Sequence, residues 1–428
     1  MFRTDDSVKS RQVPEGVEGG RNTTVSPARL TFGQPVSNLA DLSRIEEPWR
    51  ALYQTLEVKS VFLSFDFILS WYSCFTEPEQ VRVYPLLEGD EVVGYWPLQL
   101  KKEGPFRVLS SLINDHCLEA HPLIRDGYEE AFGQMGCDIL TRDRRNGDIL
   151  RYFEGYSFQP FALAKKMAVG RLHVRALVEP TYSIALPGSF EDYVALNLSD
   201  NMRKNLKRLK NKIARIDDHG FGHETGDRAV DAWPLFLEIE DSGWKGEQGT
   251  SIRRLPSRYQ EYYTRLVRML ADAGRLHLYF WKIAGQAVSG AFCYVDRDIF
   301  HWDKIGYREE YANLAPSNLL LLHIIEDVIR EMPLVTRFHL FPWDGGYKHR
   351  YTNEESYYYE KIIYNDTVLG QTAYTYNVIK ERAKRVPGIA STVGWMRNQS
   401  KLFGSRGHAG RKRSVENGSL PTEIAGER

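Results

Sequence analysis

Apolar residues recur at helical spacing in two segments of the chain. In residues 47–57 (EPWRALYQTLE) and 231–241 (DAWPLFLEIED), a tryptophan is followed by apolar residues three and four positions later. This spacing places the apolar side chains on one face of a helix. Downstream of each helix, residues 86–100 and 281–295 read as strand, polar turn and strand. The repeated order predicts a duplicated α+β domain.

Further apolar segments are bounded by turn residues and predict strands at residues 81–87, 182–186, 275–283 and 335–341. A chain of 428 residues exceeds what one hydrophobic core organises, so we expect two domains. They are predicted at residues 36–180 and 181–385, and the second includes a basic helix at 200–216. Residues 1–35 and 386–428 lack hydrophobic periodicity, so we predict a disordered N-terminal tail and a mostly disordered C-terminal tail.

Composition gives no sign of a nucleic-acid or membrane protein. The 56 basic side chains equal the 56 acidic ones, so nothing global favours DNA. No apolar segment is long enough for a membrane helix and the N-terminus is polar, so we expect a cytoplasmic protein. The cysteines are widely spaced, which predicts buried free thiols and no zinc site. They are Cys74, Cys117, Cys137 and Cys293.

The segment SDNMRKNLKRLKNKIARI, residues 199–216, predicts an amphipathic helix that Ser199 or Asp200 caps. Leu206, Leu209 and Ile213 form its apolar stripe, and seven cations occupy the other faces. Those cations could bind the phosphates of a cofactor, a lipid-linked sugar or RNA. The alternative is a helix face that is simply solvated.

Two further segments carry candidate chemistry. In residues 299–331 a strand is followed by a polar loop and an apolar helix that starts near Pro316, Ser317 and Asn318. A helix start directly after a strand offers unpaired N–H groups to a pyrophosphate. In HLFPWDGGYKHRY, residues 339–351, the pairs Asp-Gly and Gly-Gly predict a tight turn. The residues beside that turn are either solvent-exposed side chains at the end of a strand or part of a functional surface.

The order of these segments resembles the CelD-like acetyltransferases, which belong to the GNAT superfamily and are related in fold to the Fem-type aminoacyl transferases. The resemblance spans roughly Trp49 to Tyr364. It rests on FLSFDFILSWYSCF, NMRKNLKRLKNKI, SGWKGEQGT, WKIAGQAVSGAF, KIGYREEYANLAPSNLL and FPWDGGYK, taken in this order. It implies two tandem GNAT-like domains, each a mixed, mostly antiparallel sheet flanked by helices.

The resemblance also implies that the second domain binds acetyl-CoA or another acyl-CoA, with no metal. The pyrophosphate would rest on the positions that match Ala315, Ser317, Asn318 and Leu319. The family usually has Ser-Pro-Gly before this helix, whereas this chain has Ala-Pro-Ser-Asn. Without glycine the backbone approaches a phosphate less closely.

Acyl transfer needs a base for the attacking amine or hydroxyl and donors for the developing charge. Asp344 is the acidic candidate, and His301 is the alternative base because its reference pKa lies near neutrality. Tyr347 would protonate the leaving thiolate or would only pack. Lys348 would hold an anionic substrate or the developing charge.

Three other residues are candidates for binding the acceptor. The resemblance implies that Trp244 and Lys245 line the acceptor groove; the alternative is a Gly-rich loop that the tryptophan anchors. Lys304 follows His301 by three positions, so the two side chains face opposite ways if the strand alternates regularly. In that case only one of them lies in the site.

Three functions follow from these observations. The first is an acyl-CoA-dependent acyltransferase, in particular an N-acetyltransferase, acting on a small or glycan-precursor acceptor in bacterial exopolysaccharide or cell-envelope biosynthesis. The second is a Fem-like transferase that uses aminoacyl-tRNA, for which the basic helix would supply phosphate contacts. The third is a non-catalytic GNAT-like accessory protein, which the missing glycine favours.

Overall fold

A computed structural model describes residues 30–119, 121–142, 147–156, 173–342, 348–354 and 356–385. The residues up to Gln371 belong to one compact unit, and those from Thr372 onward form a second unit. The boundary falls inside helix α11 (Val368–Arg385). The sheets and the candidate site all lie in the first unit.

Residues 30–156, called here the first repeat, run as a strand, two helices, three antiparallel strands, two short helices and a further strand. The elements are β1 (Leu30–Phe32), α1 (Ser43–Thr55), α2 (Phe65–Phe75), β2 (Val81–Glu88), β3 (Glu91–Glu103), β4 (Phe106–Ser110), α3 (Glu129–Met135), α4 (Asp138–Arg142) and β6 (Ile149–Tyr156). The short strand β5 (Leu123–Ile124) pairs beside β3. β1 lies inside the stretch for which we expected disorder, and it pairs with β2.

Residues 219–339, called here the second repeat, follow the same order. The elements are β9 (His219–Thr225), α7 (Gly226–Asp241), α8 (Trp244–Glu247), α9 (Ser257–Asp272), β10 (Leu276–Ile283), β11 (Gln286–Asp296), β12 (Ile299–Tyr307), α10 (Pro316–Glu331) and β13 (Arg337–His339). In both repeats the last strand pairs in parallel with the third antiparallel strand, β6 with β4 and β13 with β12. The predicted duplicated α+β fold is confirmed.

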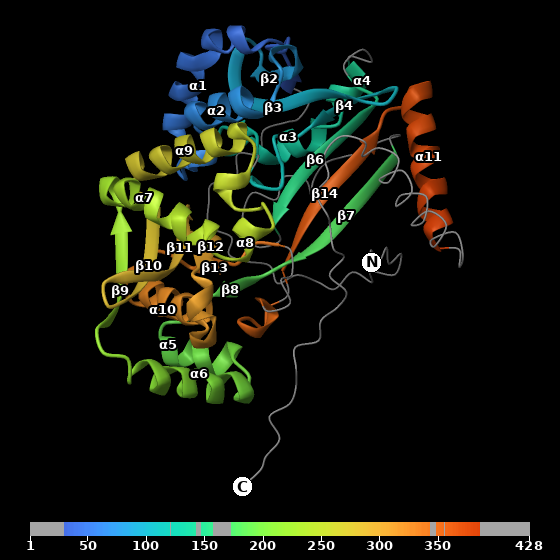
Figure 1. The fold of residues 1–428 in the computed structure, drawn as a ribbon. Coiled ribbons are helices and arrows are strands. Elements are labelled where there is room, and N and C mark those ends of the chain that lie inside the picture. Colours follow the sequence, from blue (N-terminus) through green and yellow to red (C-terminus); the bar gives the residue numbers. More distant parts are fainter. Residues whose placement is uncertain are drawn as a thin grey trace, which may run out of the picture. The chain divides into compact units, whose positions relative to one another are not determined.

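The repeats build two sheets (Figure 1). The larger has the order β1-β2-β3-β4-β6-β14-β7, and the smaller has the order β8-β13-β12-β11-β10-β9. The chain passes directly from β7 (His173–Thr181) in the larger sheet to β8 (Ser183–Ala185) in the smaller one. It later returns to the larger sheet as β14 (Ser356–Tyr364), between β6 and β7. The proposed domain boundary at residue 180 stays a prediction.

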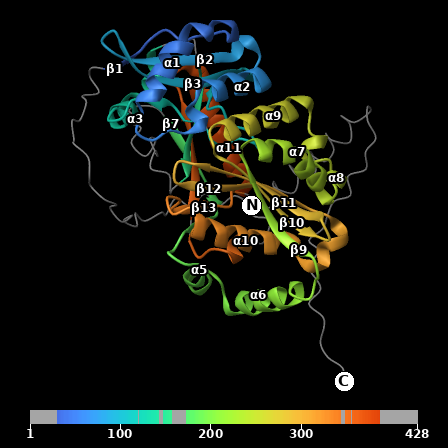
Figure 2. The ribbon, with the colours of Figure 1, turned by 90° about the vertical axis from the view of Figure 1, so that its left-hand side faces the viewer.

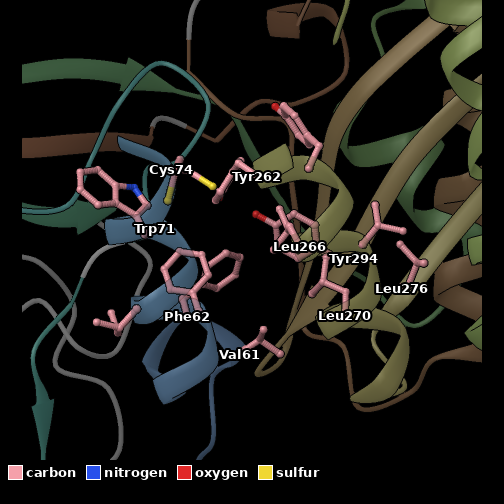
Figure 3. Close-up of a cluster of buried hydrophobic side chains, with 14 of the residues drawn as sticks. Val61, Phe62, Trp71, Cys74, Tyr262, Leu266, Leu270, Leu276 and Tyr294 are labelled. Carbon is pink, nitrogen blue, oxygen red and sulfur yellow. The ribbon is translucent and has the colours of Figure 1, made fainter. Parts of the chain in front are cut away.

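One hydrophobic core joins the two repeats. Helices α7 and α9 cover one face of the smaller sheet and α10 covers the other (Figure 2). On the first face, α9 packs against α2 of the first repeat. Phe62 lies opposite Leu266 and Tyr294, and its ring centroid is 5.5 Å from that of Tyr294 (Figure 3). Burying aromatic side chains of this size contributes strongly to holding the repeats together.

Several local predictions are confirmed. The basic segment forms α6 (Asp200–Ile213), whose N-terminus Ser199 caps by accepting a hydrogen bond from the Met202 N–H. Leu206 and Leu209 are buried. All four cysteines are free and buried. Among the described residues, no helix is both long and apolar enough to cross a membrane.

Asp296, at the end of β11, connects the first repeat to the second through hydrogen bonds. It is fully buried, and its Oδ1 accepts hydrogen bonds from the Val61 N–H at 3.0 Å and from Arg275 at 3.0 Å. Its Oδ2 accepts one from Arg297 at 3.2 Å. Arg275 also donates to the Lys59 carbonyl at 2.8 Å. Two arginines therefore balance a buried carboxylate that holds a loop of the first repeat.

We predict that Asp296→Ala lowers the free energy of unfolding by about 3–5 kcal/mol, because it removes the buried carboxylate that pairs with Arg275 and accepts the Val61 N–H. Urea denaturation measures this change. Asp272→Ala is the matched control, since the Asp272 side chain is 66% exposed and should change stability by less than about 0.5 kcal/mol. Equal effects of the two variants would contradict the role given to Asp296.

Candidate active site

The smaller sheet opens between β12 and β13. The two strands pair only from Ile299 to His301 and from Arg337 to His339. Beyond that point, residues 302–307 of β12 pair with β11 alone among the described residues. After β13, Phe341 has a φ of +62°, a conformation that is unusual for a bulky side chain and that concentrates at functional sites. Beyond His301, this edge of β12 therefore has no neighbouring strand among the described residues.

A β-bulge at Asp303 stands at the start of this opening. Trp302 pairs with Cys293 and Lys304 pairs with Phe292, so Asp303 is the extra residue on β12. His301 pairs with Tyr294. Since Phe292 and Tyr294 both face the core shared with the first repeat, His301 and Lys304 lie on one face. The expectation that these two side chains face opposite ways is wrong, because the bulge interrupts the alternation on which it rested.

A pocket of about 570 Å³ lies where β12 ends. It brings together four residues predicted from the sequence. Trp244 and Lys245 come from α8, and Ser317 and Asn318 come from the first turn of α10. The remaining walls are Glu240, Gly243, Ile305, Gly306 and Tyr307.

Close packing of α7 against β12 shapes this pocket. A Cβ atom on Gly306 would lie 2.5 Å from the Cα of Glu240, which is closer than real Cβ contacts. A Cβ atom on Gly246 would lie 1.8 Å from the Asp241 carbonyl oxygen. Glycine at 306 lets α7 lie against β12, and glycine at 246 lets the α7–α8 turn fold back on its own backbone.

The start of α10 lines the pocket and contains no glycine. Ala315 adopts the left-handed conformation with a φ of +50°, and Pro316 is the first helical residue. The N–H groups of Asn318 and Leu319 both donate to the Ala315 carbonyl, at 3.1 and 3.2 Å. The Leu319 side chain is buried in the core, so Ser317 and Asn318 are the two residues that face the pocket.

Lys245 has a deep position in the pocket wall. Its Nζ donates to the Ile305 carbonyl at 2.7 Å and to Glu240 at 3.2 Å. Glu240 is buried and also accepts a hydrogen bond from the Ile252 N–H at 2.9 Å. Burial lowers the pKa of Lys245, although Glu240 opposes the shift.

Asp303 and Lys304 form a second pair of charged residues, which is partly buried. The Lys304 Nζ lies 3.4 Å from Asp303 Oδ1 and 5.8 Å from the ring centroid of Tyr263. Burial raises the pKa of Asp303, and Lys304 and Lys245 limit the shift. A carboxylate whose pKa is raised holds a proton more readily than an ordinary aspartate, which is a common property of general bases and acids.

The first repeat contributes His116 to this group. The His116 Nδ1 lies 3.1 Å from the hydroxyl of Tyr263, and its ring lies 4.8 Å from that of Tyr259. Burial, Lys304 and Lys245 lower the pKa of His116 to about 4, so the imidazole is neutral at physiological pH. A loop of the first repeat therefore lies against the charged residues of the second.

The other predicted site residues lie elsewhere or outside the described chain. His301 is fully buried, stacks on Tyr294 at 4.6 Å and has its Nδ1 3.3 Å from His339 Nδ1. Burial lowers its pKa. Lys348 donates to the carbonyls of Phe341 and Pro342, at 3.1 and 3.0 Å. Asp344 and Tyr347 lie outside the described residues, and no described group of three His, Cys, Asp or Glu residues could hold a metal.

Sequence reasoning missed Asp303, His116 and Glu240. Asp303 carries the clearest signal, because an acidic residue flanked by His-Trp and Lys is unusual inside a predicted strand. His116 lies in the polar segment NDHC, and nothing local links it to a helix 147 residues away. Glu240 occupies the apolar stripe of its helix, which is a signal for a buried charge.

We predict that Gly306→Ala destabilises the protein by about 1–3 kcal/mol, because the new methyl group displaces α7 from the pocket wall. Thermal or urea unfolding measures the change. Gly220→Ala in β9 is the control, since a Cβ atom there meets nothing within 4 Å. A neutral Gly306→Ala variant would show that α7 does not need this close approach.

Comparisons with known proteins point to the same part of the chain. Residues 200–349 match the family model described as an acetyltransferase (GNAT) domain, and this range contains the second repeat and the pocket. This match agrees with the part of the sequence resemblance that concerns the GNAT superfamily. The CelD-like subfamily stays a prediction. A comparison with curated proteins gives no match.

Solved structures show a related fold. The crystal structure of FemX aligns with 77% of this chain and 98% of its own, with a TM-score of 0.50 and 10% identity. The C-terminal domain of a putative lysylphosphatidylglycerol synthetase from Agrobacterium fabrum covers 79% and 97%, with a TM-score of 0.46 and 11% identity. A tandem GNAT protein from the clavulanic acid biosynthesis pathway covers 78% and 98%, with a TM-score of 0.38 and 13% identity.

Proposed function

We propose that the protein is an acyl-CoA-dependent acyltransferase, in particular an N-acetyltransferase, acting on an amine or hydroxyl of a small or carbohydrate-linked acceptor. The observation that carries the proposal is the pocket at the start of α10, whose wall includes Lys245, together with the partly buried Asp303–Lys304 pair on the same strand as Ile305 of that wall. The match of residues 200–349 to a GNAT domain supports the same reaction class.

The donor would bind along the end of β12. Ser317 presents a backbone N–H and a hydroxyl at the positive end of the α10 dipole, where a pyrophosphate is stabilised. Residues 302–307 of β12 offer backbone groups to the amides of an extended pantetheine chain. When bound, such a donor supplies the acyl group as an activated thioester.

The acceptor would bind beside Asp303. In its ionised form Asp303 takes the proton from the attacking amine or hydroxyl, while the new bond to the acyl carbon forms and the C–S bond breaks. Lys304 and His116 would line the acceptor side, because both lie against Tyr263. Asp344 as base and Tyr347 as the proton donor to the thiolate stay predictions from the sequence.

The pathway and the location are also proposals. The resemblance to CelD-like enzymes supports a glycan precursor as the acceptor, in exopolysaccharide or cell-envelope biosynthesis in the bacterial cytoplasm. Lys245 and Lys304 are suited to contacting the hydroxyl groups or anionic substituents of such an acceptor.

We predict that the wild-type protein binds acetyl-CoA with micromolar affinity and that Ser317→Glu loses this binding, because a carboxylate would repel the pyrophosphate. Calorimetric titration measures both affinities. Ser43→Glu is the matched control, since Ser43 is an exposed residue in the first turn of α1. A folded wild-type protein that binds no acetyl-CoA would refute the proposed donor and favour a tRNA-dependent or non-catalytic function.

We predict that Asp303→Asn lowers kcat for acetyl transfer by about 10²-fold or more while acetyl-CoA binding is unchanged, because only the proton acceptor is lost. Because the pKa of Asp303 is raised, wild-type kcat should fall on acidification at a higher pH than an ordinary carboxylate base would give. Thiol release with a panel of amino sugars measures both effects. Asp227→Asn, at a side chain that is 90% exposed, is the control. An active Asp303→Asn enzyme would exclude Asp303 as the base.

A further inference from the structure

Helix α6 carries a positively charged face that the proposed reaction does not use. Lys204, Lys207 and Arg208 are all exposed and stand at relative positions i, i+3 and i+4, so they share one side of the helix. Asn211 continues this side by one turn. None of the three cations has an acidic partner among the described residues.

The opposite side of α6 is fixed in the protein. Leu206 and Leu209 are buried in the core beneath α10, and Lys212 donates to the Asn313 carbonyl at 2.8 Å. Both ribbon views place α6 at the outside of the second repeat, beyond α5 (Phe190–Asn197) and α10 (Figures 1 and 2). Because its apolar side is already buried, the helix presents a rigid outer surface and is not free to insert elsewhere.

The three cations of α6 form a local concentration of positive charge in a chain whose formal net charge is zero. This face, whose three cations have no acidic partner among the described residues, is therefore a local feature and does not result from a generally basic composition. Leu196, near the end of α5 and three residues before the cap of α6, is 64% exposed. No aromatic side chain lies on the outer side of α6, whereas proteins that bind single-stranded nucleic acid stack bases on such residues.

We propose that the outer face of α6, formed by Lys204, Lys207 and Arg208, docks the protein on an anionic lipid surface. Its charge complements acidic headgroups, and the exposed Leu196, three residues before the α6 cap, suits the headgroup boundary. Lys212 ties α6 to the segment that leads into α10, whose first turn lines the donor pocket.

Sedimentation with vesicles tests the proposal. The wild-type protein should bind vesicles of phosphatidylcholine and phosphatidylglycerol, should not bind phosphatidylcholine alone, and should lose binding as salt is raised. Replacing Lys204, Lys207 and Arg208 together by glutamine should weaken binding about a hundredfold, roughly fivefold per cation. Glutamine is a good helix former, so circular dichroism should be unchanged.

A second triple variant tests whether vesicle binding depends on this face of α6 or on the net charge of the protein. Replacing the exposed Arg44, Lys102 and Arg228 by glutamine removes the same charge elsewhere and should leave vesicle binding intact. Equal loss in both triple variants would overturn the proposal. The proposal would also be overturned if the wild-type protein did not bind vesicles that contain phosphatidylglycerol, whether or not it bound transfer RNA through α6. The assay contains no acyl donor, so its outcome is independent of the proposed enzymatic activity.

Discussion

The hydrogen-bonded carboxylate of Asp296 is the interaction on which the rest of the molecule depends. It accepts from a backbone N–H of the first repeat and from two arginines of the second, in a site that water does not reach. A buried charge with several fixed donors tolerates little displacement, so it sets the position of one repeat against the other. The shared aromatic core and the contact between His116 and Tyr263 require that position.

The Asp303–Lys304 pair shows how one β-bulge sets the positions of charged side chains. One extra residue at the bulge turns Lys304 to the face occupied by His301 and leaves Asp303 beside it. The sheet opens two residues earlier, where β13 leaves β12. Buried carboxylates and lysines are costly to a fold, and here they gather where one edge of β12 has no neighbouring strand among the described residues.

Local patterns in the sequence were enough to predict α1, α6, α7 and α10, two hairpins and the duplication, because periodicity and turn residues act over short distances. The helix start at Ser317 and Asn318 came from the same patterns, whereas Trp244 and Lys245 came from the family resemblance; all four residues line one pocket. They could not reveal the bulge, since its cause is the register between β11 and β12. His116 was missed because its partner Tyr263 is 147 residues away, and a contact of that range depends on the whole fold.

The return of the chain as β14 has a consequence for how the protein is made. β14 fills the gap between β6 and β7 and pairs with both. A nascent chain that has emerged only as far as the second repeat therefore has two strand edges in its larger sheet with no neighbour between them. Exposed edges are the usual starting points for wrong pairing with other chains. The second repeat is in effect an insertion within the larger sheet, and it must allow that sheet to close around β14, the last of the described strands to be synthesised.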